Sequence, residues 1–270
     1  MASSLRYLNK VALVTGGSKG IGEGVVRVFV QNGAKVGFCS IEEEAGKKLE
    51  SEVNRLGPGE SIFIKCDVQN EDEIKYRSTI DRFGQLDCLV NNAGWHPPQQ
   101  VIDDTSVEEF KSLINLNLIN YFAFAKYSLP HLRKTNGNII NVSSLVATVG
   151  QSYAIPYVCT KGAIVAFSKA LAIDEAKHGV RVNTFSPGNI WTPLWEWCAK
   201  QSDNPEAMIQ GGANAQLNGR FGTIEECGQV CLFLASEATF TTGIELISSG
   251  GAELNFGCKN QMMERTNIYE

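Results

Sequence analysis

The stretch Thr-Gly-Gly-Ser-Lys-Gly-Ile-Gly at residues 15–22 follows the apolar run Val11–Val14 and precedes a helical pattern that ends at Asn32-Gly33. Glycines at 16, 20 and 22 permit a tight turn and let the backbone approach a pyrophosphate, which the N-terminus of the next helix binds. The spacing is a variant of the common Gly-x-Gly-x-x-Gly fingerprint. A plain turn is the alternative, but the position between a strand and a helix favours a dinucleotide site.

Short β-branched runs alternate with helical patterns along the rest of the chain. This alternation is typical of βαβ units in an α/β protein with a parallel sheet. It predicts one domain over residues 1–258, a substrate-loop insertion at about 189–222 and a loose tail at 259–270. Strands are expected at 11–14, 35–39, 61–66, 86–90, 139–142, 180–185 and 244–247. Helices are expected at 21–31, 42–56, 71–82, 157–177 and 225–236, with another that begins near 107 and is interrupted near Pro130.

Composition excludes several classes of protein. The net charge of −5 leaves no basic field for nucleic acid or an anionic membrane, and no apolar run approaches the length of a spanning helix. Eight cysteines form no Cys-x-x-Cys pair, and only three histidines are present, so no metal site is expected. Reduced thiols and the absence of a secretory signal pattern predict a cytoplasmic protein.

A tyrosine and a lysine begin the helix predicted from residue 157. Tyr157 and Lys161 are four residues apart and share one helix face. Free tyrosine has a pKa near 10, and an adjacent ammonium favours the phenolate, so we expect a lowered pKa for Tyr157. An ordinary tyrosine with a solvated lysine is the alternative. Ser144, at the end of the predicted fifth strand, favours the chemical interpretation, because it and Tyr157 can address one substrate oxygen.

These motifs, taken in order, resemble those of the short-chain dehydrogenase/reductase family. The resemblance covers roughly residues 8 to 255 and implies a single doubly wound Rossmann domain, a seven-stranded parallel sheet and a homotetramer. It also implies hydride transfer between a nicotinamide cofactor and an alcohol or ketone carbon of a small-molecule substrate. The implied catalytic tetrad is Asn117, Ser144, Tyr157 and Lys161. The residues implied to bind the cofactor are Gly16, Ser18, Lys19, Gly20, Ile21, Gly22, Ser40, Asp67, Val68, Asn91, Ala93, Gly94, Tyr157, Lys161, Pro187, Gly188, Ile190 and Thr192.

The choice between NAD and NADP depends on the end of the predicted second strand. Relatives that prefer NAD place an aspartate there, whereas this chain has Ser40. A carboxylate would bind the ribose hydroxyls and repel a 2′-phosphate. Lys19 favours a phosphate, but no arginine follows Ser40 and the acidic run 42–44 opposes one. We expect NAD, with NADP not excluded.

Two substrate classes remain open, together with two interpretations outside this enzyme class. A 17β-hydroxysteroid needs a long apolar slot, which Leu194, Trp195 and Met208 offer, whereas L-fucose needs convergent polar groups. The expected substrate contacts are Ser144, Tyr157, His96, Gln151, Asn189 and Trp195. The run 256–258 is a candidate cover for a neighbouring subunit's pocket. The rival interpretations are a cofactor-binding regulator without turnover and a nucleic-acid-binding Rossmann-like protein, which the acidic charge disfavours.

Overall fold

The computed structural model of the protein describes residues 5–74 and 78–254. All seven predicted strands are present, with ends within two residues of the predicted ones. They are β1 (Val11–Thr15), β2 (Lys35–Ser40), β3 (Glu60–Lys65), β4 (Cys88–Asn91), β5 (Asn138–Val142), β6 (Arg181–Pro187) and β7 (Glu245–Ser248).

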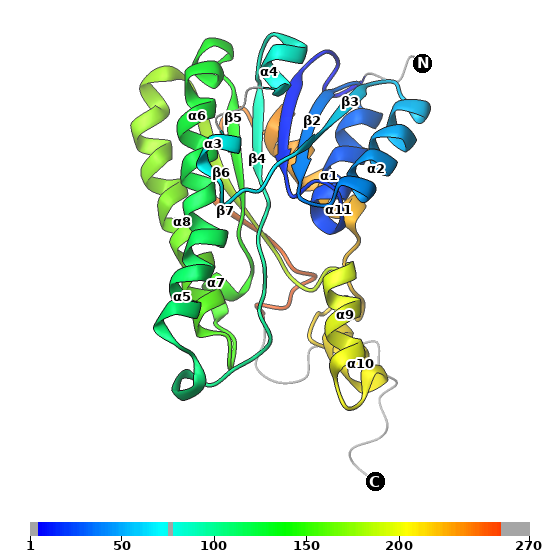
Figure 1. Ribbon diagram of the computed structural model, residues 1–270, viewed down its shortest axis with the longest axis vertical. Coiled ribbons are helices and arrows are strands. Elements are labelled where there is room, and N and C mark those ends of the chain that lie inside the picture. The colour runs from blue at the N-terminus through cyan, green and yellow to red at the C-terminus, as the bar shows by residue number, and fades with distance from the viewer. Residues whose placement is uncertain (1–4, 75–77, 255–270) are drawn as a thin grey trace.

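These strands form one parallel sheet in the order β3-β2-β1-β4-β5-β6-β7 (Figure 1). Val14 of β1 pairs with Phe38 of β2 on one side and with Val90 of β4 on the other. The chain therefore winds outward in both directions from the β1–β4 pair, which confirms the doubly wound Rossmann topology. In such sheets, ligands bind beyond the carboxyl ends of the strands where the winding direction reverses.

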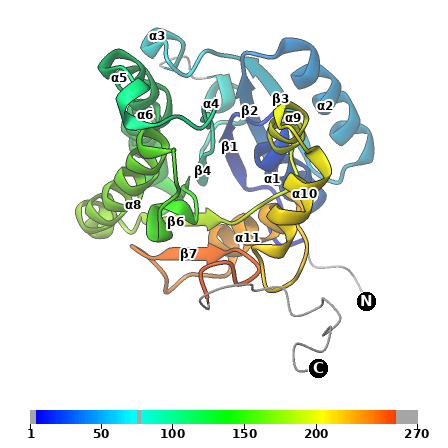
Figure 2. The ribbon, with the colours of Figure 1, turned by 90° about the horizontal axis from the view of Figure 1, so that it is seen from below.

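Helices lie on both sides of the sheet (Figure 2). The α-helices are α1 (Gly20–Gln31), α2 (Glu43–Leu56), α3 (Glu71–Ile74), α4 (Ser78–Phe83), α5 (Val107–Ile114), α6 (Asn120–Thr135), α7 (Val146–Val149), α8 (Ile155–Glu175), α9 (Pro193–Gln201), α10 (Pro205–Asn214) and α11 (Ile224–Ser236). Single 3-10 turns occur at Ile102–Asp104 and Ala176–His178, and a π-helical turn joins α5 to α6 at Asn115–Ile119.

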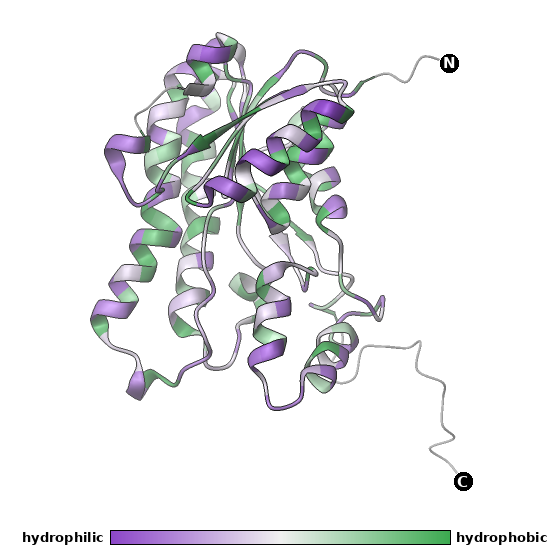
Figure 3. Cartoon of the chain, turned by 45° about the vertical axis from the view of Figure 1, so that its right-hand side comes forward, coloured by the Kyte–Doolittle hydropathy of each residue, from purple (hydrophilic) through white to green (hydrophobic). Residues whose placement is uncertain are grey.

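Alternating side chains of each strand enter two separate cores. Ala12 and Val14 of β1 pack with α1, α2 and α11, whereas Val11 and Leu13 pack with α6 and α8. Because successive side chains of a strand point to opposite faces, a run that is apolar throughout must be covered on both sides. Figure 3 shows the consequence: apolar strands lie inside, and the helices are more polar on their outer surfaces.

The helix expected from residue 107 is present, but its interruption lies elsewhere. Ser106 and Glu109 form the predicted capping box at its start. Pro130 lies inside α6, and the helix continues to Thr135, so the expected break near Pro130 is wrong. Leu129 and Leu132, both buried, anchor this part of α6 against the sheet and support it despite the missing proline N–H.

Two further expectations need correction or lie outside the described residues. The helix predicted at 71–82 is observed as α3 and α4, with residues 75–77 between them not described. The tail at 259–270 and the run 256–258 also lie outside the described residues. Within residues 5–74 and 78–254, no helix combines the length and apolar character needed to cross a membrane. The cysteines of these segments are free thiols.

Candidate active site

The glycine turn after β1 is closed by contacts that exclude larger residues. Gly16 has φ +63°, and a Cβ built on Gly22 would lie 2.2 Å from the carbonyl oxygen of Gly16. No side chain other than hydrogen fits at Gly22, because backbone cannot yield as a side-chain tip can. The turn delivers the chain into α1, whose N-cap residue Lys19 makes no side-chain capping bond in the described part of the chain. The first N–H groups of α1 therefore suit an anion such as a pyrophosphate.

Thr15 joins this turn to the loop that follows β4. Its Oγ1 accepts hydrogen bonds from the backbone N–H groups of Asn92 (2.9 Å) and Ala93 (3.0 Å). The side chain of Asn92 donates in return to the carbonyl oxygens of Thr15 and Gly16. These bonds hold the two loops together at the point where the strand order reverses. This role of Thr15 is not among the sequence-based predictions, although the place of Thr15 between a strand and a glycine is a usable signal.

The residues predicted to bind the adenosine end of a cofactor lie around the carboxyl ends of β2 and β3. Ser18 and Ser40 are buried, and their hydroxyl oxygens are 2.9 Å apart. Asp67 lies two residues beyond β3, where its Oδ1 accepts from the backbone N–H of Gln69, and Val68 is buried next to it. The turn and these side chains together fit a dinucleotide.

Polar side chains cross the sheet behind the predicted catalytic residues. Asn91 of β4 donates to Asn141 of β5 (2.9 Å), and Asn141 donates to Ser168 of α8 (2.8 Å). Ser143 then donates to the carbonyl oxygen of Lys161 (2.8 Å). Buried networks of this kind, when their donors are satisfied, fix one arrangement of the elements they join. The network anchors α8 against β5, and the side chain of Asn91 therefore has a structural partner besides its predicted cofactor role.

Tyr157 and Lys161 lie on one face of α8, beside the end of β5. The Nζ of Lys161 is 5.6 Å from the centre of the Tyr157 ring and donates to the carbonyl oxygen of Val142 (3.0 Å). Ser144, two residues beyond that carbonyl, lies near enough to the Tyr157 hydroxyl for hydrogen bonding between them to lower the pKa of the phenol. The structure thus brings Ser144, Tyr157 and Lys161 together as the sequence predicts.

The pKa of Tyr157 shifts against the expectation. Burial raises it to about 12, and the hydrogen bond with Ser144 offsets only part of that rise. Burial also lowers the pKa of Lys161 to about 7. The tyrosine retains some solvent contact at its surface, yet protein atoms surround it closely enough for desolvation to dominate. The expected lowering of the Tyr157 pKa by an ammonium is therefore wrong for this structure, because burial disfavours the charged form of both groups.

Asn117 reaches this group from the π-helical turn between α5 and α6. It is fully buried, and its side chain bonds both the N–H and the carbonyl oxygen of Trp95 at 2.9 Å. Its amide also donates to Thr160 on α8 (3.2 Å). A Cβ on Gly94 would lie 3.1 Å from the Asn117 Oδ1 and 3.9 Å from the Lys161 Nζ. Asn117 therefore joins the loop after β4 to α8, and Gly94 lies close to both Asn117 and Lys161.

The polar candidates for substrate contact meet at the Tyr157 ring. The His96 ring lies 4.2 Å from it, centre to centre, and the His96 Nε2 is 3.2 Å from the Oε1 of Gln151. His96 Nδ1 is 2.6 Å from the carbonyl oxygen of Pro97, which fixes the ring's orientation. The structure therefore groups His96 and Gln151 with Tyr157.

The insertion after β6 forms α9 and α10, which extend beyond the lower edge of the sheet in Figure 1. Thr192 caps α9 by accepting from the N–H of Trp195 (3.3 Å). Trp195 packs edge-on against Phe221 at 4.8 Å between ring centres. Asn189 donates its side-chain amide to the carbonyl oxygen of Gly212 (2.9 Å), so that donor holds α10 in place. Among the predicted substrate residues, Asn189 is thus the one with an evident structural task.

One aromatic contact bridges α9 and the loop after β4. The rings of Trp95 and Trp197 lie 5.8 Å apart at an interplanar angle of 52°. From the sequence, Trp197 is a weaker candidate than Trp195 for the pocket wall, with plain packing as the alternative, and Trp95 is not among the expected substrate contacts. Residue 95 follows the Asn-Asn-Ala-Gly run directly, so its position was readable, but its partner more than a hundred residues away was not.

The remaining predicted cofactor residues follow β6. Gly188 and Ile190 flank Asn189, and the Ile190 side chain is buried while its backbone bridges to Gly222. Pro187 is the last residue of β6. This segment leads directly into Thr192, the last of the predicted cofactor residues and the N-cap of α9.

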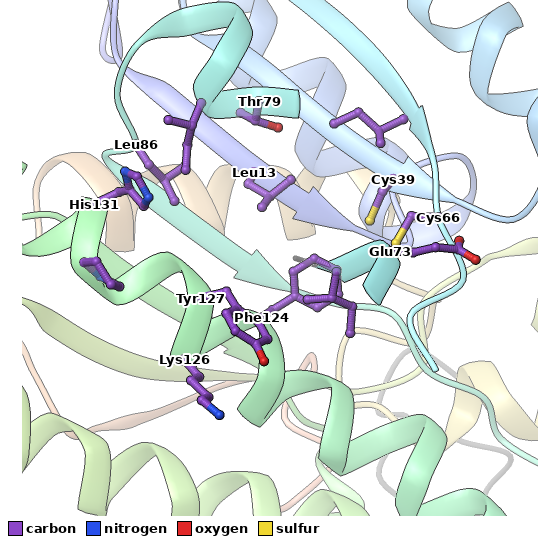
Figure 4. Close-up of a pocket in the computed structure, with 14 residues that line it drawn as sticks. Leu13, Cys39, Cys66, Glu73, Thr79, Leu86, Phe124, Lys126, Tyr127 and His131 are labelled. Carbon is purple, nitrogen blue, oxygen red and sulfur yellow. The ribbon is translucent and has the colours of Figure 1, made fainter. Parts of the chain in front are cut away.

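A separate cavity of about 320 Å³ lies between the sheet and α6 (Figure 4). Leu13, Cys39 and Cys66 line its sheet side, and Phe124 and Tyr127 line its helix side. None of the four tetrad residues is among its described lining residues. Its wall comes from both sides of positions 75–77, which the structure does not describe, and we assign it no ligand.

Fold and site together define an oxidoreductase with a dinucleotide cofactor. The chain belongs to the short-chain dehydrogenase/reductase family: the family model described as enoyl-(acyl carrier protein) reductase matches residues 16–253. Members of this family use a nicotinamide cofactor.

Several proteins of similar sequence or structure are named for their action on sugars. The chain is 52% identical over 261 residues to L-fucose dehydrogenase of Bos taurus, covering 96% of this chain and 95% of that protein. L-fucose dehydrogenase of Mus musculus is also 52% identical over 261 residues, covering 96% and 94%. L-sorbose reductase from Gluconobacter frateurii, solved with NADPH and L-sorbose, aligns with a TM-score of 0.88 at 27% identity and covers 94% of this chain and 100% of that one.

Proposed function

We propose that the protein oxidises L-fucose to its lactone with NAD as hydride acceptor. The observation that carries this proposal is the polar group around Tyr157, in which His96 and Gln151 are hydrogen-bonded beside the phenol. Such convergent polar side chains suit a substrate with several hydroxyls. The identity of 52% to L-fucose dehydrogenases over nearly the full chain supports the same substrate.

The proposed mechanism assigns one task to each member of the tetrad. Tyr157 removes the proton of the anomeric hydroxyl, and Ser144 orients that hydroxyl by a hydrogen bond. The oxidised nicotinamide, when bound, supplies the acceptor for the hydride from the same carbon and a positive charge near the phenol. The positive charge of a bound nicotinamide would favour the phenolate. The pKa of Tyr157, which is about 12 without cofactor, would therefore be lower in the enzyme with bound cofactor.

Lys161 and Asn117 serve proton exchange in this mechanism. The amine of Lys161, whose pKa is lowered to about 7 by burial, changes protonation near neutral pH. Asn117 bonds the backbone of Trp95 in the loop after β4, and by resemblance to the family it would hold a water that connects Lys161 to solvent. The residues proposed for the cofactor itself are those of the glycine turn, the ends of β2 to β4, and the segment from Pro187 to Thr192.

The test is a matched pair of substrates with each cofactor. We expect the purified protein to reduce NAD in the presence of L-fucose, with NADP less effective, as measured by absorbance of the reduced nicotinamide. Oxidation of estradiol without oxidation of L-fucose would overturn the sugar assignment. Tight NADH binding without turnover on alcohols or sugars would instead indicate a cofactor-binding regulator.

A 17β-hydroxysteroid is the second candidate substrate, with estradiol oxidised to estrone. It is favoured by the aromatic cluster of the insertion, where Trp191 and Trp195 both pack edge-on against Phe221. Aromatic surfaces of this kind bind large apolar ligands. The substrate pair above separates the two candidates.

We also propose a cytoplasmic homotetramer. Exposed apolar side chains on the outer surfaces of α6 and α8 support assembly: Phe122 is 53% exposed and Ile173 is 77% exposed. The free, mostly buried thiols support a reducing compartment. Light scattering coupled to gel filtration measures the assembly, and a monomer would contradict it.

A further inference from the structure

β2 ends at Ser40, at the position where a carboxylate would distinguish NAD from NADP. Glu42, two residues later, lies beside Ser40. The hydroxyls of Ser18 and Ser40 are 2.9 Å apart, and Ser18 Oγ is 3.1 Å from the carboxylate of Glu42. The backbone N–H of Glu42 donates to Ser40 Oγ at 3.1 Å. Three residues from the glycine turn, β2 and the start of α2 therefore form one hydrogen-bonded group.

Counting protons determines the direction of these bonds. A carboxylate only accepts, and each serine has one proton to donate. Ser18 therefore donates to Glu42, Ser40 donates to Ser18, and the Glu42 N–H donates to Ser40. Each member of the group has a hydrogen-bond partner in this arrangement. The bond from Ser18 holds the Glu42 carboxylate beside the glycine turn.

The same carboxylate pairs with Lys19. The Lys19 Nζ lies 2.6 Å from the Glu42 Oε1, and both side chains are about half exposed. Lys19 is the cation of the glycine turn that would favour a phosphate ester at this end of the cofactor. Glu42 neutralises it, so the pair presents no net positive charge to a phosphate ester.

The position of Glu42 in the sequence is typical of a residue that binds the ribose of a dinucleotide. In dinucleotide-binding folds, a carboxylate about 20 residues after the glycine turn bonds the ribose 2′-hydroxyl. Glu42 follows the last glycine of the turn, Gly22, at that spacing. Ser40 is short and buried, so it leaves room above the end of β2 and anchors the backbone from which Glu42 extends.

We propose that Glu42 is the residue that sets the preference for a dinucleotide without a 2′-phosphate. It does so through its ion pair, which removes Lys19 as a phosphate ligand and leaves no net positive charge at this position to attract a 2′-phosphate. The inference rests on the proposed function, that the protein binds a nicotinamide dinucleotide and prefers NAD. It assigns the discrimination to a side chain at the start of α2 rather than to the last residue of β2.

The experiment measures dissociation constants of NADH and NADPH directly, by fluorescence titration of the full chain, so that no turnover is needed. Glu42→Gln keeps the size of the side chain and removes its charge. We expect the wild-type protein to bind NADH more tightly, and Glu42→Gln to shift the NADH/NADPH affinity ratio at least about tenfold toward NADPH. Adding Lys19→Met to that variant should abolish most of the gain.

Glu44→Gln is the matched control, because it makes the same charge change on an exposed residue in the first turn of α2. It should leave the affinity ratio within about twofold of the wild-type value, against the tenfold expected for Glu42→Gln. A ratio unchanged by Glu42→Gln, or changed equally by Glu44→Gln, would overturn the inference while cofactor binding stands. A wild-type preference for NADPH would overturn it as well. Binding of neither cofactor would overturn the proposed function itself.

Discussion

The glycine turn at residues 16–22 and the α9–α10 segment both lie at the carboxyl edge of the sheet, but different forces hold them. The turn is defined by backbone: Gly22 sits against the Gly16 carbonyl, and Thr15 and Asn92 bond main-chain groups. The α9–α10 segment is held by helix caps and ring contacts such as Trp95–Trp197. Backbone geometry permits few residue types, whereas ring contacts permit many, so the cofactor side is constrained and the substrate side can vary.

The largest effect on turnover should come from changing Tyr157, whose hydroxyl serves both the cofactor side and the substrate side of the site. Tyr157→Phe removes the hydroxyl near Ser144 and keeps the ring against His96. We predict a loss of turnover of at least about a hundredfold, the scale of a lost general base. The dissociation constant for NADH should stay within a few-fold of the wild-type value. Turnover near the wild-type rate would contradict the assignment of Tyr157.

Gly22→Ala tests whether backbone contacts define the cofactor side of the site. The added methyl would meet the Gly16 carbonyl oxygen at 2.2 Å, so the turn must distort. We predict weaker NADH binding by at least about tenfold and a destabilisation of about 1–3 kcal/mol, as for other overpacked sites. Gly211→Ala in α10 is the matched control, because its Cβ would meet nothing within 4 Å. Equal losses in the two variants would refute the distinction between the two regions.

The buried amine on α8 should make stability depend on pH. Burial lowers the pKa of Lys161 to about 7, against 10.5 as the ordinary value, so between these values the unfolded chain binds more protons at this position. Stability contributed by this group therefore rises with pH above 7, by up to about 1.4 kcal/mol per pH unit. Tyr157, with its raised pKa, stays protonated in both states up to about pH 9.

Lys161→Met should remove that slope. Urea unfolding of the cofactor-free protein at pH 7, 8 and 9 measures it, and the difference between variant and wild type isolates Lys161 from other titrating groups. Parallel pH profiles for the two proteins would show that the amine is not desolvated as the structure indicates.

The smallest effect on activity is expected from a substitution on the substrate side of the site. Trp197→Ala removes the ring that contacts Trp95, and an aromatic pair contributes about 0.5–1.5 kcal/mol. We predict a rise in KM for the sugar of roughly two- to tenfold, which is that energy range expressed as an affinity. The kcat and the NADH dissociation constant should change less than twofold on the same scale. A larger loss in NADH affinity than in substrate affinity would place Trp197 on the cofactor side.

This difference between the regions also explains what could be predicted from the sequence. The strands and the glycine turn follow from local patterns, because β-branched runs and glycine spacing act within a few residues. Pro130 was a misleading local signal: packing of Leu129 and Leu132 outweighs the missing N–H. The partners of Trp197 and Glu42 were not readable, because each depends on a side-chain orientation that the folded neighbours decide. The raised pKa of Tyr157 was not readable either, because its cause is burial, which the sequence does not report and which the hydrogen bonding with Ser144 only partly offsets.

The π-helical turn at Asn115–Ile119 has a consequence for how the chain tolerates insertions and deletions. An α-helix turns by about 100° per residue, so one residue more or less rotates everything beyond it. Removing a single residue from this turn would let α5 and α6 join as a regular helix, but Asn117 would then leave its place between Trp95 and Thr160. Homologues that retain this asparagine should therefore retain the length of the segment, and gaps should fall in the loops on either side.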